Sequence, residues 1–182
     1  MLFFLILIGI LALAAFWVMG SYNKLVTLRT KAEEGFATID VFLKKRYDLI
    51  PNLVETVKGY TAHEKGTLDA VINARSRAMS GTPTERIDGE GELSQALGRL
   101  MMLSEAYPEL KANTQFTQLQ SELTQLESEI ERSRRYYNGT AAQMNIEVKK
   151  FPGVIIANMF DFKEIPYFEV EGGQREAVKV QF

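Results

Sequence analysis

The chain has 182 residues with 21 basic and 23 acidic side chains, which give a net charge of −2. This length predicts one domain with an extension. A near-neutral charge argues against a protein that neutralises nucleic-acid phosphates, so no nucleic-acid partner is expected. The chain has no cysteine and one histidine. This composition excludes disulfides, thiolate nucleophiles and cysteine-ligated zinc, and it excludes a metal site built on two histidines of one chain.

The first twenty residues, MLFFLILIGILALAAFWVMG, contain no charged side chain. As a helix they would rise about 30 Å, which matches the hydrocarbon thickness of a bilayer. Trp17 and Tyr22 fall at one end, where aromatic side chains favour the membrane–water boundary. A cleaved signal peptide would begin with basic residues and have a shorter apolar core, so we predict a retained transmembrane anchor over residues 1–21, with lipid as its partner. Basic residues follow from Lys24 onward, and the positive-inside rule places the body in the cytoplasm.

Between the anchor and residue 79, apolar residues recur at gaps of three and four, the spacing of one helix face. They are Phe36, Ile39, Leu43, Tyr47, Ile50, Val54 and Val57. The pattern predicts a single helix over residues 22–79, about 87 Å long if it is unbroken. The segment SGTPTERIDGEGE, residues 80–92, combines glycine, proline, serine and threonine and predicts the one loop of the body.

Two further helices are predicted after this loop. One covers residues 93–107 and ends before Pro108, because the residue before a proline is disfavoured in helical geometry. The other covers residues 114–150, with Asn113 or Thr114 as its N-cap. Its outer face alternates glutamine, serine, glutamate and arginine. This pattern is typical of a solvated face, and a partner-binding face is the alternative.

Pro152 ends the third helix and can begin a short apolar helix in FPGVIIANMF, followed by an irregular or extended tail. The predicted fold class is all-α. A transmembrane helix (1–21) precedes an antiparallel up-and-down bundle of three long helices (22–150), and a short fourth helix with its tail (151–182) completes the chain. The fourth helix either seals the bundle or contacts the bilayer or another subunit. The residues for such a contact are Phe151, Ile155, Ile156, Met159 and Phe160.

The stretch RYDLIPNLV places a proline inside the first predicted helix. Its residues are Arg46, Tyr47, Asp48, Leu49, Ile50, Pro51, Asn52, Leu53 and Val54. A proline in a helix interior removes one hydrogen bond and costs about 3 kcal/mol. Because the apolar stripe continues in phase on both sides, Pro51 is predicted to bend the helix without ending it. The carbonyl of Tyr47 then needs another donor, and Asn52 or a water is expected to supply it. A core helix is the favoured interpretation, and a docking surface is the alternative.

No residue pattern indicates catalysis. The pair His63-Glu64 lacks the second histidine of a zinc-protease helix, and no Gly-x-Ser-x-Gly elbow occurs. The carboxylates are spread along the predicted helices, and no pair stands out. We therefore expect no enzymatic activity, no catalytic residue, no metal site and no cofactor.

Several motifs together resemble the LemA family. They are the N-terminal apolar span, YNKLVTLR, IDVFLKKRYDLIPNLVETVKGYTAHE, AYPELKAN, ERSRRYYN and FPGVIIA. Phe42, Lys45 and the pair Met144-Asn145 depart from the residues usual in that family. The resemblance implies a single-pass protein of the bacterial cytoplasmic membrane with a four-helix body and no known enzymatic activity. It also implies similarity to a magnetosome-membrane protein and gene neighbourhoods that contain membrane metallopeptidases.

The predicted function is a non-enzymatic, membrane-anchored scaffold that self-associates and organises membrane or envelope proteins. Its basis is the length of the first helix, which leaves residues 22–38 without an obvious partner in the same chain. Neighbouring copies would cover these residues, so a homo-oligomer is expected. The alternative is an adaptor or regulatory partner of a membrane metallopeptidase in envelope quality control.

Overall fold

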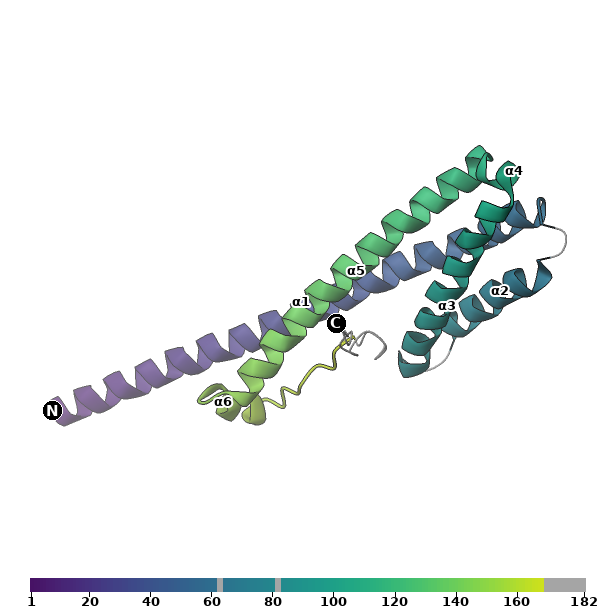
Figure 1. Ribbon diagram of the computed structural model, residues 1–182. Coiled ribbons are helices and arrows are strands. Elements are labelled where there is room, and N and C mark those ends of the chain that lie inside the picture. The colour runs from purple at the N-terminus through teal and green to yellow at the C-terminus, as the bar shows by residue number, and fades with distance from the viewer. Residues whose placement is uncertain (62–63, 81–82, 169–182) are drawn as a thin grey trace, which may run out of the picture. The chain divides into compact units, whose positions relative to one another are not determined.

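The computed structural model describes residues 1–61, 64–80 and 83–168, and of residues 83–88 it describes the backbone alone. The elements in these residues are helices (Figure 1). They are α1 (Leu2–Lys58), α2 (Lys65–Met79), α3 (Pro83–Leu103), the 3-10 helix η1 (Ser104–Ala106), α4 (Pro108–Lys111), α5 (Thr114–Lys149) and α6 (Gly153–Met159). The predicted all-α class is confirmed, whereas several of the predicted helix boundaries are not.

The described chain forms two compact units. Unit 1 comprises Met1–Ile39 and Arg132–Tyr167, and unit 2 comprises Asp40–Glu131 with Phe168. The helices α1 and α5 each contribute one part to unit 1 and the other part to unit 2. Unit 1 therefore contains the apolar N-terminal stretch, and unit 2 contains the RYDLIPNLV stretch.

The apolar stretch at the start of α1 is exposed along its length. Its most apolar 18-residue window has a mean hydropathy of 2.8, and none of that window is buried. Of the described helices, α1 is the one long and apolar enough to cross a membrane. An exposed apolar surface of this length needs lipid or another protein around it, since water solvates it poorly.

The first helix ends at Lys58, so the single helix predicted over residues 22–79 is wrong. The backbone N–H of Thr61 donates to the carbonyl of Val57 at 3.1 Å as the helix ends. Gly59 follows the last helical residue, a place where glycine is common. The next helix, α2, buries Leu68, Val71, Ala74 and Ala78. Because both helices carry apolar residues at gaps of three and four, the spacing alone could not show where the chain turns.

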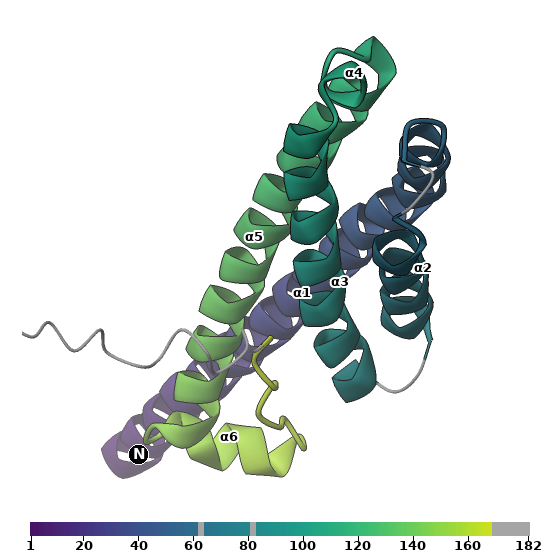
Figure 2. The same cartoon turned by 45° about the vertical axis from the view of Figure 1, so that its right-hand side comes forward.

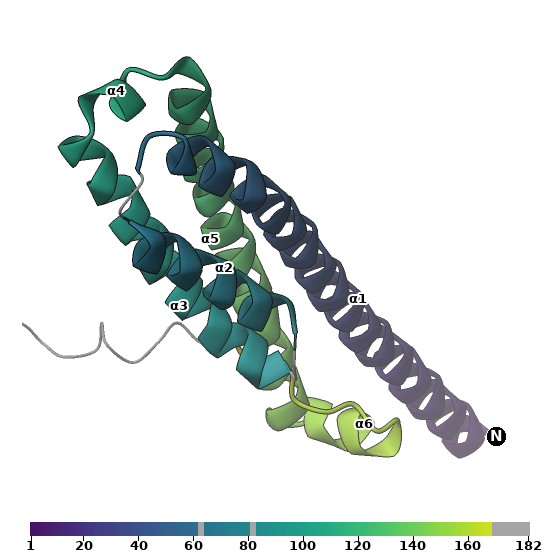
Figure 3. The same ribbon diagram turned by 90° about the vertical axis from the view of Figure 1, so that its right-hand side faces the viewer.

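Residues 83–92 belong to α3, so the loop predicted over residues 80–92 is wrong. Pro83 is the first residue of this helix, a position where its missing N–H costs no hydrogen bond. The helices α2 and α3 pack side by side (Figure 3). A Cβ at Gly89 would lie 2.7 Å from the nitrogen of Ala78. This glycine, which suggested a loop, is therefore a packing residue that lets two helix backbones approach closely.

The predicted third helix is confirmed as α5, which ends one residue before the predicted end at residue 150. The side chain of Asn113 caps it, because Oδ1 accepts a hydrogen bond from the N–H of Phe116 at 2.8 Å. The helix predicted over residues 93–107 corresponds to the end of α3 followed by η1. Pro108 begins α4 at the first helical position, and so it starts a short helix as well as ending the preceding one.

Unit 1 is built around an apolar cluster supplied by three helices. Figure 2 shows α6 following the end of α5. Its buried members are Leu25 and Leu28 of α1, Met144 and Val148 of α5, and Ile156 and Ala157 of α6. Further from the anchor, the rings of Phe36 and Tyr137 lie 5.8 Å apart. Residues 22–38 therefore have partners in the same chain, so the expectation that they lack an intramolecular partner is wrong. Since α1 ends earlier than predicted, the 36 residues of α5 are enough to run back along it.

The segment after α6 is held against α5 by hydrogen bonds. Asn145 donates through Nδ2 to the carbonyl of Ile165 at 2.9 Å and accepts through Oδ1 from the N–H of the same residue at 2.8 Å. The hydroxyl of Tyr137 donates to the carbonyl of Pro166 at 2.8 Å. Helix α6 itself follows a cis peptide bond between Phe151 and Pro152. The predicted irregular tail is confirmed as far as residue 168, and residues 169–182 lie outside the described residues.

Candidate functional site

The RYDLIPNLV stretch lies in the part of α1 that belongs to unit 2. Its buried members are Arg46, Tyr47, Ile50, Leu53 and Val54, Leu49 is half-buried, and Asp48, Pro51 and Asn52 are exposed. Buried and exposed residues alternate with the period of a helix, so the stretch supplies both a core face and an outer face. The helix continues through Pro51, as predicted, and the bend at this residue stays a prediction.

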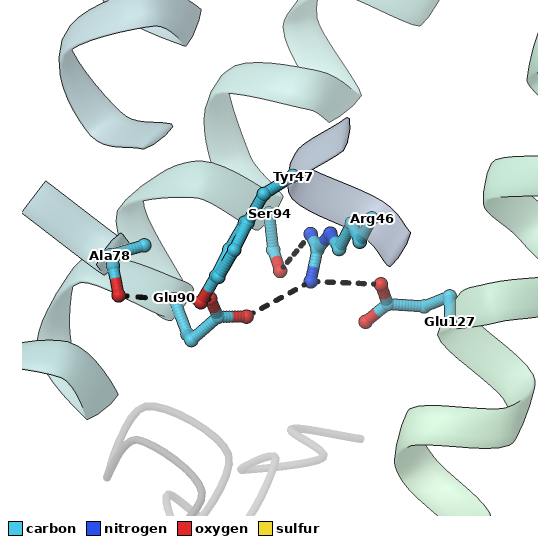
Figure 4. A network of polar contacts seen from close by, with 6 residues as sticks. All are labelled: Arg46, Tyr47, Ala78, Glu90, Ser94 and Glu127. Carbon is cyan, nitrogen blue, oxygen red and sulfur yellow. Dashed lines mark hydrogen bonds and ion pairs between the residues drawn. The ribbon is translucent and has the colours of Figure 1, made fainter. Parts of the chain in front are cut away.

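Arg46 is the charged centre of the site, with 2% of its surface exposed. Its Nη1 lies 3.3 Å from Oε2 of Glu90 and 3.1 Å from Oε2 of Glu127 (Figure 4). Its Nη2 donates to the hydroxyl of Ser94 at 2.8 Å. A buried guanidinium needs such partners, because removal of a charge from water is costly unless hydrogen bonds and an opposite charge replace the solvent.

Tyr47 and Arg46 bind the same carboxylate from two sides. The hydroxyl of Tyr47 donates to Oε1 of Glu90, and it lies 3.3 Å from the carbonyl of Ala78 (Figure 4). The side chain of Glu90 is 5% exposed. Its carboxylate is therefore satisfied by a phenol and a guanidinium within the protein.

The carbonyl of Tyr47 faces the position where Pro51 has no N–H to donate. Arg75 of α2 supplies a donor, since its Nε lies 2.8 Å from this carbonyl oxygen. Arg75, and not the predicted Asn52, is therefore the side chain that fills this role. Asn52 is exposed, whereas α2 packs on this side of α1 and brings a long donor side chain within reach.

We name these residues the polar junction: Arg46, Tyr47, Arg75, Ala78, Glu90, Ser94 and Glu127. They come from α1, α2, α3 and α5. Hydrogen-bonded charges in a low-dielectric interior favour one arrangement of the helices, because a shift would leave a buried charge unpaired. Among the described residues, no three histidine, cysteine, aspartate or glutamate side chains are grouped to hold a metal ion. The chemistry of the junction therefore suits the fixing of helix positions.

A shallow groove in unit 2 lies between the end of α1 and the start of α2. It encloses about 360 Å³. Val54, Leu68 and Ile72 line it with apolar groups, and Glu55, Lys58, Lys65 and Asp69 contribute two negative and two positive charges. With balanced charges, the groove does not favour a strongly charged ligand.

The predicted membrane-side residues gather in unit 1. Trp17 and Tyr22 are 41% and 38% exposed, and the ring of Tyr22 lies 4.8 Å from that of Phe160. Of the five residues proposed for a bilayer or subunit contact, Ile156 is buried in the cluster of unit 1. The other four, Phe151, Ile155, Met159 and Phe160, are exposed. Helix α6 thus seals the core with one face and leaves its other face uncovered within the described chain.

Two titratable groups of unit 1 have perturbed pKa values. Burial raises the pKa of the Tyr137 hydroxyl above its ordinary value of 10.0. Burial also acts to raise the pKa of Glu147, but hydrogen bonds and charges from Lys150 and Lys24 outweigh it and hold that pKa below 4.5. Both ammonium groups lie 2.6 Å from Oε1 of Glu147. At neutral pH, Tyr137 is therefore a neutral donor and Glu147 an ionised acceptor.

Comparison with known proteins identifies the family. The LemA family model matches residues 35–182, which include the whole polar junction. The chain belongs to the LemA family. The matched range covers the RYDLIPNLV stretch and the α5–α6 part of unit 1, whereas residues 1–34, which include the apolar stretch, Leu25 and Leu28, precede it.

Relatives of this LemA-family chain include proteins with two kinds of name. The chain is 25% identical to "Magnetosome protein MamQ" of Magnetospirillum gryphiswaldense over 190 residues, which cover 88% of this chain and 70% of the relative. It is 24% identical to "Magnetosome protein MamQ 2" of Paramagnetospirillum magneticum, with 91% and 71% covered. It is 25% identical to "Protein LemA" of Metamycoplasma hominis, with 95% and 81% covered.

Sequence reasoning missed the partners of Arg46 and Tyr47. Glu90, Ser94 and Glu127 are ordinary polar residues of helix faces, and nothing in their local pattern marks them as buried or paired. One signal was present around Glu90, which stands between Gly89 and Gly91. Two glycines beside a carboxylate indicate a backbone in close contact when the segment is helical, but the same residues also fit a loop.

Proposed function

We propose that this LemA-family chain is a non-enzymatic, membrane-anchored helical scaffold that holds its body beside the bilayer, self-associates, and organises membrane or envelope proteins. One observation carries the proposal. The exposed apolar stretch and the buried residues Leu25 and Leu28 belong to the same helix, α1, and to the same compact unit. The anchor is thus joined to the body by packed helix, with no loop between them.

The proposal follows from what a continuous helix does mechanically. A flexible linker would let the body sample many heights and orientations above the membrane. In unit 1, by contrast, α5 and α6 pack on α1 within two turns of the end of the apolar stretch. An arrangement of this kind transmits position, which is the property that a scaffold needs and that an enzyme does not require.

Two features support a role in organising other proteins. The polar junction joins four helices through buried hydrogen bonds and ion pairs, and exposed apolar side chains remain on the body. Val26 of α1 is 38% exposed and Ile146 of α5 is 59% exposed. The similarity to proteins named as magnetosome proteins is consistent with a function at membranes. We place the body on the cytoplasmic side of a bacterial inner membrane, with α1 crossing once, from the basic residues that follow the span.

Single-cysteine crosslinking tests self-association, because the chain has no cysteine of its own. Val26→Cys and Ile146→Cys would be oxidised separately in intact membranes and separated on a non-reducing gel. We expect a disulfide-linked dimer from at least one of them. Ala32→Cys is the matched control on α1, since Ala32 is 2% exposed and its thiol would face the core.

Cysteines at further exposed positions, together with a photo-crosslinker, separate the scaffold from the adaptor. If every surface cysteine, including positions on unit 2, leaves the chain monomeric while a photo-crosslinker recovers one membrane metallopeptidase at fixed stoichiometry, the scaffold proposal fails and the adaptor replaces it.

Labelling of Thr30→Cys by a membrane-impermeant maleimide tests on which side of the membrane the body lies. A cytoplasmic body requires that labelling appear only after the membrane is permeabilised.

A further inference from the structure

Helix α6 carries two apolar faces, although it has only seven residues. Gly153, Ile156 and Ala157 are buried against α1 and α5. Phe151, Ile155 and Met159 follow one another at intervals of four residues and are 80%, 48% and 65% exposed. Phe160 adds a ring that is 46% exposed. We call these four residues the α6 stripe.

The stripe lies at the level where the apolar part of α1 ends. Val18 packs against the cluster that contains Ile156 and Ala157. The ring of Tyr22 lies 4.8 Å from Phe160 and 5.7 Å from Phe162. All of these residues belong to unit 1, and Figure 1 shows the N-terminal part of α1 extending past α6.

The length of the apolar stretch sets this level relative to a bilayer. Residues 2–20 rise about 28 Å as a helix, close to the ~30 Å of bilayer hydrocarbon. Val18 and Tyr22 are each two residues from Gly20, which is about 3 Å along the axis. If the bilayer hydrocarbon covers the apolar stretch, α6 therefore lies at the level of the headgroup layer.

We propose that α6 lies on the bilayer surface, with the α6 stripe inserted between the lipid headgroups. The proposal rests on the membrane anchor of the proposed function and adds a second lipid contact to it. A short helix with an exposed apolar face is stable at this depth, because its apolar side chains leave water while its polar groups stay at the interface. A tether at α6 would also resist tilting of the body about α1.

Charge does not carry this contact. Around α6 lie Lys24, Lys149, Lys150 and Lys163, together with Glu147, Asp161 and Glu164. Lys149 pairs with Glu164 at 2.7 Å, Lys163 with Asp161 at 3.4 Å, and Lys24 and Lys150 share Glu147. Four positive charges less three negative charges leave one positive charge. Insertion should therefore occur in vesicles of zwitterionic phosphatidylcholine and should change little when anionic lipid is added.

The single tryptophan of the chain makes a depth measurement possible. The full-length protein would be reconstituted in phosphatidylcholine vesicles that carry bromine at defined acyl-chain positions, and quenching of tryptophan emission would be compared. In the natural sequence, Trp17 reports the anchor. In a Trp17→Phe background, Phe151→Trp reports the α6 stripe. Tyr136→Trp in the same background is the control, because Tyr136 is 52% exposed but lies far from the anchor: a Cβ added at Gly35, fifteen residues beyond Gly20 on α1, would lie 3.2 Å from its ring.

We expect bromines nearest the headgroups to quench Phe151→Trp and Trp17 strongly and Tyr136→Trp hardly at all. If Trp17 is quenched and Phe151→Trp behaves like the Tyr136→Trp control, the α6 proposal is overturned while the anchor stands. If Trp17 is not quenched, the anchor itself fails. A Phe151→Trp emission that is blue-shifted but unquenched, together with a dimer by native mass spectrometry, would assign the stripe to a second copy of the chain and would also overturn the lipid contact.

Discussion

Different interactions stabilise the interior of each of the two units of this LemA-family protein. Unit 1 packs apolar side chains from three helices, and the ion pairs of Glu147 with Lys24 and Lys150 leave both ammonium groups about half exposed. Unit 2 adds a buried charge, Arg46, and surrounds it with Glu90, Tyr47 and Ser94. Apolar packing tolerates small shifts, because dispersion and burial depend weakly on direction. A buried ion pair does not, because its stabilisation requires good geometry. Unit 2 therefore specifies a precise helix arrangement, whereas unit 1 secures the body to its anchor.

The largest expected effect comes from removal of the charge at the polar junction. Arg46→Met leaves Glu90 buried beside Tyr47 without its guanidinium, and loss of one partner of a buried pair costs about 3–5 kcal/mol. The thermal unfolding midpoint of the full chain in detergent, followed by circular dichroism at 222 nm, should fall accordingly. Site-resolved hydrogen exchange should show the loss in α2 and α3, with protection retained in unit 1.

Two variants sharpen this result. Glu127→Gln removes a partner whose side chain is 51% exposed, and its effect should stay below about 1 kcal/mol. The double variant Arg46→Met, Glu90→Met replaces the buried pair by apolar groups and should recover most of the loss. A double variant as unstable as Arg46→Met alone would show that packing volume, and not the unpaired charge, accounts for the effect.

The second effect concerns the apolar cluster of unit 1. Ile156 is 1% exposed, and Ile156→Ala should cost about 2–5 kcal/mol through lost burial and the cavity left behind. Hydrogen exchange should rise in α6 and in the segment held by Asn145. The matched control is Ile155→Ala, because Ile155 is 48% exposed. This substitution should change the stability of the detergent-solubilised protein by less than about 0.5 kcal/mol. Equal losses in the two variants would contradict the assignment of opposite faces to α6.

The third effect lies at the contact of α2 with α3. Alanine normally stabilises a helix interior relative to glycine by about 0.5–1 kcal/mol. At Gly89 the added Cβ would meet the backbone of Ala78 at 2.7 Å, and overpacking of this kind costs about 1–3 kcal/mol, so Gly89→Ala should lower the unfolding midpoint. At Gly98, on the same helix, no atom lies within 4 Å of such a Cβ, so Gly98→Ala should raise it. The same sign for both substitutions would refute the close approach.

The smallest effect is a pH dependence of unit 1. The pKa of Glu147 is lowered in the folded state, so its stabilisation is complete above its ordinary pKa of 4.5 and is lost as the pH falls through the lower, folded value. Because Lys24 and Lys150 are about half exposed, the contribution should be below about 1 kcal/mol. The unfolding midpoint of the natural protein should therefore fall more steeply below pH 4.5 than that of Glu147→Gln. Glu33→Gln, at a 64% exposed ion pair, should leave the slope unchanged.

The helical class and the apolar stretch could be predicted because both are local properties. Twenty uncharged residues and a stripe at gaps of three and four need no knowledge of the rest of the chain. The N-cap at Asn113 and the passage of α1 through Pro51 were predictable for the same reason. The end of α1 at Lys58 was not, because an apolar stripe has the same period in one long helix as in two helices that fold back on each other. Because one helix was predicted over residues 22–79, residues 22–38 were expected to lack a partner in the same chain.

The polar junction lay beyond sequence reasoning for a different reason. Arg46 and Tyr47 were recognised as part of a motif, but their partners come from residues 28 to 81 positions further along the chain, in helices whose boundaries had to be right first. The segment around Gly89 shows the difficulty. Its glycines, proline and threonines are typical of a loop, and they become packing residues when α2 provides a backbone for them to approach.

By itself, the sequence determined that the protein is helical, that it begins with a stretch suited to a membrane, and that it belongs with the LemA family. Backbone propensity, hydropathy and motif identity are properties of the local sequence, so they can be recognised without knowledge of the fold. The tertiary structure decided which residues act together. It paired Arg75 with the carbonyl that Pro51 leaves free, buried Arg46 against Glu90, and brought α6 to the end of the apolar stretch. These contacts depend on where helices turn and pack, which a one-dimensional period does not specify.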